Sequence, residues 1–201
     1  MTIQKTALHD LHIESGAKLV DFAGWEMPIQ YKNLKEEVLA VRNEVGMFDV
    51  SHMGEFIIDG KDTYKFLDYL LPNAIEKAQM NKAIYSPLLR ENGTIIDDLI
   101  VYKISDTKAL ICVNAANIFK DFSWITSQIE KFDCQLSDIS NEISLIALQG
   151  PKTEEIMKKL DLGYAYKSIP YYSVTVDPGQ ELLPAWFLKD CKTQMFLMHC
   201  Y

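Results

Sequence analysis

Two adjacent carboxylates are the side chains of this sequence best placed to do chemistry. Asp97 and Asp98 lie in the segment Asn92-Gly-Thr-Ile-Ile-Asp-Asp-Leu99, at the expected start of a strand. Side chains alternate between the two faces of a strand, so only one of the two carboxylates can face a given pocket. A carboxylate among apolar neighbours is costly unless it is paired, hydrogen-bonded or functional. The alternative is that both lie at an exposed hairpin rim, where charged side chains are common.

Amide and aromatic side chains nearby also allow two interpretations. Asn114 and Asn117 stand where a strand is expected to end and a helix to begin. Either could cap that helix, or a side-chain amide could face a ligand, because such junctions often line a cleft. Tyrosines flanked by strand-like residues either pack in a sheet or form a flat aromatic wall for a planar ligand. These are Tyr85, Tyr102, Tyr171 and Tyr172.

Neither a nucleophile nor a metal site is indicated. His52 lies between a predicted helix and a predicted strand, and no Ser or Cys is placed beside it by spacing, so we expect a structural role. Cys112, Cys134, Cys191 and Cys200 form no C-x-x-C pair and have no His at zinc-site spacing, so we expect free thiols and no metal. The common nucleotide-binding, hydrolase and zinc-protease motifs are absent from the sequence.

Periodic apolar residues define the elements that must position these side chains. One helix is predicted from Leu34, Val38, Val41 and Val45, with Gly46 as its stop signal, and another from Ile118, Phe122, Ile125 and Ile129. Asp62 is predicted to cap a third helix, and Asn92-Gly93 predicts a hairpin turn.

The order β-α-β-β-β-α-β over about residues 54 to 140 predicts an α+β fold, with helices packed on one face of an antiparallel sheet. A further strand at Ile143–Leu148 precedes Gly150-Pro151, and Pro151 is expected in the first turn of a helix.

Composition limits the class of protein. The 201 residues include 28 acidic and 20 basic side chains, for a formal net charge of −8, and 48% are hydrophobic. Such a chain is too apolar to be disordered and too acidic for general affinity to nucleic acid or an anionic membrane. No apolar run is long enough for a membrane helix and no signal peptide opens the chain, so we expect a cytoplasmic or organelle-interior protein.

Several phrases together resemble one family, the aminomethyltransferase (T-protein) of the glycine cleavage system. The resemblance runs from about Thr6 to Ser173, with its phrases in the family's order and spacing. The phrases are VDFAGWEMP at 20–28, VR at 41–42, GMFDVSHMGE at 46–55, GTIIDDL at 93–99, VNAAN at 113–117 and LQGP at 148–151.

The resemblance implies a reaction of glycine catabolism and one-carbon metabolism. A T-protein takes an aminomethyl group carried on the lipoyl arm of the H-protein and transfers its methylene to tetrahydrofolate, releasing ammonia. Tetrahydrofolate is then a co-substrate, lipoylated H-protein is the partner, and no metal, nucleic acid or membrane is required. The location implied is the bacterial cytoplasm or the mitochondrial matrix.

The resemblance also implies site residues and domains. Asp98 matches the family's carboxylate that faces the folate amines and acts by electrostatic positioning with general-base character. Positions similar to the family's folate cavity are Tyr85, Asp98, Tyr102, Val113, Asn114 and Tyr172. The implied folate-binding fold has a ferredoxin-like central subdomain at 54–140, and residues 1–53 and 141–183 form the first domain.

The end of the sequence departs from the family pattern. Members are nearly twice this length and carry an Arg-Thr-Gly-Tyr-Thr-Gly-Glu-Asp-Gly phrase shortly after the position of Tyr172, which this chain lacks. We therefore expect 184–201 to be an anomalous, divergent or truncated tail, with the family's C-terminal barrel domain absent. Apolar faces such as Ile143–Leu148 are then predicted to lack cover. The alternatives to an active enzyme are a non-catalytic folate-binding module and an inactive, truncated remnant.

Overall fold

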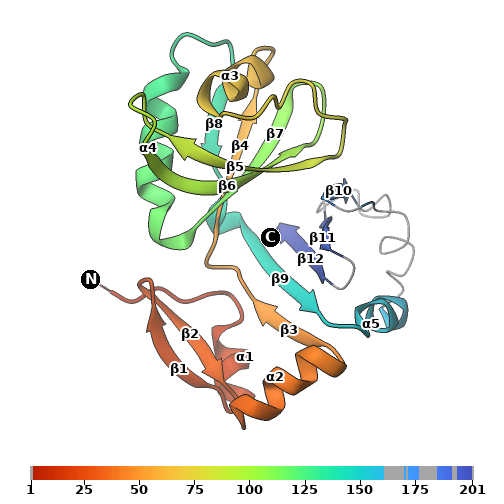
Figure 1. The fold of residues 1–201 in the computed structure, drawn as a ribbon. Coiled ribbons are helices and arrows are strands. Elements are labelled where there is room, and N and C mark those ends of the chain that lie inside the picture. The colour runs from red at the N-terminus through yellow and green to blue at the C-terminus, as the bar shows by residue number, and fades with distance from the viewer. Residues whose placement is uncertain (1, 161–169, 171, 177–184, 192–193, 201) are drawn as a thin grey trace. The chain divides into compact units, whose positions relative to one another are not determined.

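The computed structural model describes residues 2–160, 170, 172–176, 185–191 and 194–200. The chain divides into two compact units. Unit 1 comprises Met1–His52, Ser144–Tyr171 and Thr175–Tyr201, and unit 2 comprises Met53–Ile143 and Tyr172–Val174. The α+β fold predicted from the sequence is confirmed, because both units combine helices with antiparallel strands (Figure 1).

Unit 2 is a five-stranded antiparallel sheet in the order β5-β6-β7-β4-β8. Its strands are β4 (Gly54–Asp59), β5 (Ala83–Leu89), β6 (Ile95–Lys103), β7 (Lys108–Val113) and β8 (Gln135–Asp138). The helices are α3 (Thr63–Leu70) and α4 (Ile118–Ile129), with short 3-10 helices η1 (Ala115–Asn117) and η2 (Ser140–Glu142). The order β8-β4-β7-β6 with its two helices is ferredoxin-like, and β5 adds a strand at the edge.

The core of unit 2 lies between the sheet and its two helices, which cover the same face (Figure 1). Phe66 and Leu67 of α3 and Ile125 of α4 are fully buried there. They pack with side chains from alternate positions of β4, β6 and β7, which are Phe56, Ile58, Leu99, Val101, Ala109, Ile111 and Val113. The predicted stripe of α4 therefore faces the sheet, and its periodicity identified the buried side.

The turn between β5 and β6 follows the sequence prediction. Gly93 has a φ of +80°, a conformation that favours glycine, and the side chain of Asn92 accepts a hydrogen bond from the backbone N–H of Thr94. This turn sets the register in which Pro87 lies opposite Asp98.

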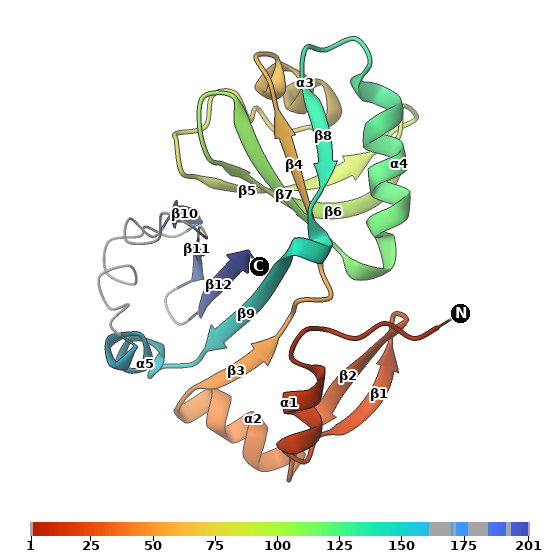
Figure 2. The same ribbon diagram turned by 180° about the vertical axis from the view of Figure 1, so that it is seen from behind.

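Unit 1 is built from the two ends of the described chain. Its N-terminal part contains α1 (His9–Glu14), the hairpin β1 (Lys18–Phe22) and β2 (Trp25–Gln30), α2 (Leu34–Asn43) and β3 (Gly46–Asp49). Its later part contains β9 (Ile143–Gln149) from Ser144 onward, α5 (Thr153–Lys159), β11 (Ala185–Cys191) and β12 (Gln194–Cys200). Strand β10 (Ser173–Val176) is divided, with Ser173 and Val174 in unit 2 and the rest in unit 1. Figure 2 shows β3 running beside β9 in a sheet of order β10-β11-β12-β9-β3.

Four local predictions need correction. The predicted helix at 34–45 ends at Asn43, and Gly46 instead begins β3. Asp62 is at the N-cap of α3 but makes no side-chain cap bond, since its carboxylate binds Lys65 and the backbone N–H of Asp133. The helix after Gly150 begins at Thr153, so Pro151 precedes its first turn.

The fourth correction concerns apolar cover. Strand β9 was predicted to lack cover, and this prediction is wrong. Its apolar side chains are at most 4% exposed at Ile143, Leu145, Ala147 and Leu148. The uncovered apolar side chains lie elsewhere in unit 1, because α2 has no buried residue. The face of that helix which the sequence predicted to be apolar is open, with Leu34 58% and Val38 50% exposed.

Candidate functional site

The two adjacent carboxylates lie on opposite faces of β6, as alternation requires. Asp98 is exposed, whereas Asp97 is only 6% exposed. Asp97 shares its face with Leu99 and Val101, which belong to the core beneath the helices. The exposed-rim interpretation is therefore wrong for Asp97, which is buried at the core edge, whereas Asp98 is open to a ligand.

The side-chain amide of Asn114 joins the two carboxylates. Its Nδ2 donates to Asp97 Oδ1 at 3.0 Å, to the backbone oxygen of Asp98 at 3.1 Å and to Asp98 Oδ1 at 3.5 Å. The backbone N–H of Asn114 also donates to Asp97 Oδ2 at 3.4 Å. Asn114 is at the N-cap of η1 and Asn117 at the N-cap of α4, as predicted, but neither residue makes a side-chain cap bond.

A third carboxyl group, that of Asp121, is buried in helix α4. Asp121, in the first turn of α4, is fully buried, and neither of its carboxyl oxygens has a hydrogen-bond partner among the described residues. Burial, followed by the interaction with the Asp97 carboxyl group, raises the pKa of Asp121 to about 8. Burial alone would raise the pKa of Asp97, but interactions with Asp121, Asn114 and Asn117 outweigh it and lower that pKa. The two shifts have opposite directions, which favours the proton on Asp121 over Asp97.

Tyr85 completes the surroundings of Asp98. Its side chain is 56% exposed, and its hydroxyl donates to Asp98 Oδ2 at 3.0 Å. Pro87 lies opposite Asp98 and Tyr85 lies opposite Ile100, so Tyr85 and Asp98 form a diagonal cross-strand pair on one face. The hydrogen bond to Asp98, followed by burial, raises the pKa of Tyr85, which keeps the phenol protonated as a donor.

The other predicted folate-cavity residues differ in exposure and in the sheet face on which they lie. Tyr102 is four positions after Asp98 on β6 and so on the same face, but it is only 5% exposed. Val113 pairs with Leu99 and its side chain is buried in the core, on the opposite face from Asp98. Tyr172 is 49% exposed with a φ of +48°, and its backbone oxygen accepts from Ala83 N at 2.8 Å. Tyr171 lies outside the described residues.

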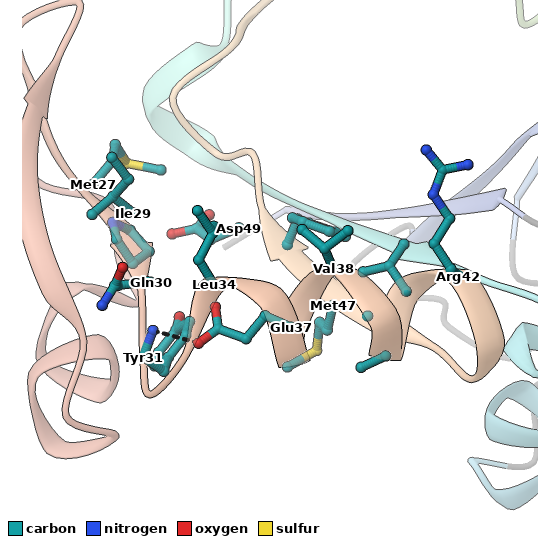
Figure 3. Close-up of a pocket in the computed structure, with 15 residues that line it drawn as sticks. Met27, Ile29, Gln30, Tyr31, Leu34, Glu37, Val38, Arg42, Met47 and Asp49 are labelled. Carbon is teal, nitrogen blue, oxygen red and sulfur yellow. Dashed lines mark hydrogen bonds between the residues drawn. The ribbon is translucent and has the colours of Figure 1, made fainter.

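A second feature, in unit 1, is an apolar groove of about 460 Å³ between β2, α2 and β3 (Figure 3). Leu34 and Val38 of α2 and Met47 of β3 line it. Its few polar groups include Glu37, whose carboxylate accepts from the backbone N–H groups of Tyr31 and Lys32, drawn in part in Figure 3. None of the predicted folate residues belongs to this groove.

The phrase that contains His52 folds around a buried carboxylate, Asp49. Its side chain accepts from Thr6 Oγ1 at 2.6 Å and from Ser51 N at 3.0 Å, and lies 2.9 Å from His12 Nε2. Burial would raise the pKa of Asp49, but hydrogen bonds from Ser51, Thr6 and His12 lower it. His52 is half-buried with its ring packed edge-to-face against that of Phe22, and its buried Nδ1 has no hydrogen-bond partner among the described residues.

The structure also bears on the cysteines, on possible metal ligands and on membrane-spanning helices. Cys112 and Cys134 are free thiols, buried and half-buried. Within the described ranges, no group of three or more His, Cys, Asp or Glu side chains is arranged to hold a metal ion. Among the same residues, none of the helices is both long and apolar enough to cross a membrane.

The residue that sequence reasoning missed is Asp121. It lies three positions after Ile118 and four before Ile125, on the apolar stripe of the predicted helix. A carboxylate on a buried helix face is a signal in itself, because it requires a partner or a proton. Its partner, Asp97, could not be assigned by spacing because the two are on different elements.

Comparison with known proteins gives consistent results. A family model described as the GCVT N-terminal domain matches residues 8–180. An aminomethyltransferase from Thermotoga maritima is 52% identical over 171 residues, which are 85% of this chain and 47% of that protein. One from Thermosipho melanesiensis is 48% identical over 170 residues, again 85% of this chain and 47% of the relative. The chain thus spans about half the length of the curated relatives it matches.

Solved structures agree with these sequence relatives. The glycine cleavage system aminomethyltransferase T from Bartonella henselae superimposes with a TM-score of 0.89 at 28% identity, over 98% of this chain and 54% of that one. A heterotetrameric sarcosine oxidase from a Corynebacterium has a TM-score of 0.55 at 11% identity, over 84% of this chain and 87% of that one, which shows a likeness of fold alone.

Proposed function

The chain belongs to the GCVT N-terminal domain family, and from this we propose that it carries the folate-binding carboxylate of a glycine cleavage system aminomethyltransferase. The proposed reaction transfers the methylene of an aminomethyl group from a lipoylated H-protein to tetrahydrofolate, with release of ammonia. The observation that supports it most directly is Asp98, exposed on one sheet face and held by Tyr85 and Asn114.

The geometry gives Asp98 a defined task in this proposal. Its Oδ2 accepts from Tyr85 and its Oδ1 lies near the Asn114 amide, so the carboxylate is oriented while its remaining lone pairs face outward. Tetrahydrofolate has N–H groups at N5 and N10, and a carboxylate can accept hydrogen bonds from them. As N5 forms its bond to the methylene carbon, positive charge develops on that nitrogen, and an adjacent carboxylate stabilises it and can take the proton.

The proposed partners follow the same chemistry. We propose tetrahydrofolate as the co-substrate and lipoylated H-protein as the donor, which is what the resemblance to the family implies for a complete glycine cleavage system aminomethyltransferase. We propose Tyr85, Tyr102, Asn114 and Tyr172 as further folate contacts. Val113 is left out of these contacts, because its side chain is in the core and its backbone pairs with Gly54 and Leu99.

Calorimetric titration of the 201-residue chain with tetrahydrofolate tests the proposal. We expect binding by the parent and a loss of about 1–3 kcal/mol in Asp98→Asn, because a charge-assisted hydrogen bond becomes a neutral one. Asp106→Asn is the matched control, since it removes one charge from an exposed turn of the same unit. Equal affinities for the parent and Asp98→Asn would contradict the role of Asp98.

Activity is tested separately, by transfer of labelled methylene from lipoylated H-protein to tetrahydrofolate. Transfer by the parent and its loss in Asp98→Asn support the enzyme. Folate binding without transfer would identify a folate-binding module instead. No folate binding by a folded chain would overturn the proposal for this polypeptide.

A further inference from the structure

We propose that Asp97 is a positioning residue for Asp98, acting through the side-chain amide of Asn114, and that Asp121 holds Asp97 in place with a shared proton. This inference deepens the proposed folate-binding function and rests on it.

The first step is the orientation of the Asn114 amide. Nδ2 has hydrogens to donate and no acceptor capacity, whereas Asp97 Oδ1 and the two Asp98 oxygens can only accept. The contacts with Asp97 Oδ1 at 3.0 Å and with the backbone oxygen of Asp98 at 3.1 Å together fix which end of the amide points toward Asp98. If the Asp97 carboxylate were removed, the amide would lose its shortest contact and be held by Asp98 alone, so the orientation of the Asp98 carboxylate would loosen.

The second step is the fixation of Asp97 itself. It is 6% exposed and accepts from the backbone N–H of Asn114 as well as from its side chain. Two ionised carboxylates cannot hydrogen-bond to one another, because neither has a donor. Asp121 is fully buried on α4, and no other group donates to its oxygens within the described part of the chain. The bond that we infer between Asp97 and Asp121 therefore requires one proton, and Asp121 is the group that retains it.

The third step is the charge around this pair. The positive charge of Lys120 lowers the pKa of Asp121, but its Nζ donates to the backbone oxygen of Ile96 at 2.7 Å. Asp98 adds further negative charge, which raises that pKa. Apart from the proton shared with Asp97, no group of the described chain donates to either oxygen of Asp121. Loss of the proton would therefore place two facing carboxylates in contact, and repulsion would displace Asp97 from Asn114.

The first experiment is tetrahydrofolate binding measured between pH 6.5 and pH 9. We expect the affinity of the parent to fall as the pH rises through about 8, where Asp121 loses its proton. Asp121→Asn keeps a neutral N–H donor toward Asp97 at every pH, so it should bind within about twofold of the parent at pH 7 and lose the alkaline fall. A merely structural role would leave the two pH profiles parallel, which would overturn the proposal.

The second experiment removes Asp97. Asp97→Ala should weaken folate binding by about tenfold at pH 7, as expected when one positioned hydrogen bond is lost. Asp97→Asn retains an oxygen that can accept from Asn114 and should restore most of the affinity. Equal binding by Asp97→Ala and the parent would contradict the proposal.

A readout without folate separates this inference from the proposed function. In a nuclear magnetic resonance titration, the side-chain amide signals of Asn114 should shift with a midpoint near pH 8 in the parent and stay constant in Asp121→Asn. If the parent binds no folate but this titration is observed, the network stands and the folate function fails. If the Asn114 signals do not respond in the parent, the positioning network fails whatever the folate result.

Discussion

The hydroxyl of Tyr85 is the most accessible single group that touches Asp98. Because it donates to Asp98 Oδ2 from an exposed position, Tyr85→Phe should remove an orienting bond without opening a cavity. We expect folate binding to weaken by about two- to tenfold, and the free energy of unfolding to change by less than about 0.5 kcal/mol. Calorimetry and urea unfolding measure the two effects.

The control for Tyr85→Phe is Tyr69→Phe in the same unit. Tyr69 is equally exposed at 55%, and its hydroxyl makes only a 3.4 Å contact with Gln128. This variant should bind folate as the parent does. If both phenylalanine variants weaken binding alike, the effect does not come from the contact with Asp98.

Strand β4 contains a side chain whose burial costs stability. Glu55 is fully buried, neither of its oxygens has a hydrogen-bond partner, and burial followed by repulsion from Asp138 raises its pKa to about 9. The unfolded chain releases this proton near the ordinary value of 4.5. Between those two values the folded state binds more protons, so stability falls by about 1.4 kcal/mol for each pH unit gained.

Glu55→Gln should remove this dependence. We expect the variant to be more stable than the parent at pH 7, and the difference to grow toward pH 9 and vanish below pH 4.5. Urea unfolding followed through Trp124, with Trp25 and Trp186 replaced by Phe, reports on unit 2. Parallel stability curves for parent and variant would show that Glu55 is ionised in the folded state.

The spacing of apolar residues predicted where helices and strands form, but it did not predict which of their faces are buried. The i, i+4, i+7 spacing identified both α2 and α4, but only α4 buries its stripe, because periodicity marks an apolar side without saying what packs on it. Alternation correctly separated Asp97 from Asp98. It could not tell which of the two was buried, since that depends on α4 and on Asp121, both distant in sequence.

The open groove of unit 1 should govern how the chain behaves in solution. Met47 is 68% exposed beside Leu34 and Val38, which gives a contiguous apolar surface. We expect this surface to bind a hydrophobic dye and to promote self-association. The double variant Leu34→Gln with Val38→Gln should reduce both effects while keeping α2, because glutamine is a good helix former.

Light scattering against concentration and dye fluorescence measure these effects. Leu160→Gln is the matched control, since Leu160 is 55% exposed after α5 and does not line the groove. Unchanged association in the double variant would show that the groove is not the surface responsible.

The discontinuity of unit 1 has a consequence for how the chain folds as it leaves the ribosome. Every strand of the β5-β6-β7-β4-β8 sheet lies within one continuous stretch, so this sheet can form as soon as β8 has been made, before Tyr172–Val174 complete unit 2. Strand β3 is synthesised before all of them, yet its partner β9 follows all of them. During that interval β3 is an unpaired edge with an apolar side chain at Met47, the kind of surface that chaperones bind and that pairs wrongly with other chains. Slower translation of the stretch between β3 and β9 should therefore lower the yield of folded protein by prolonging that exposure.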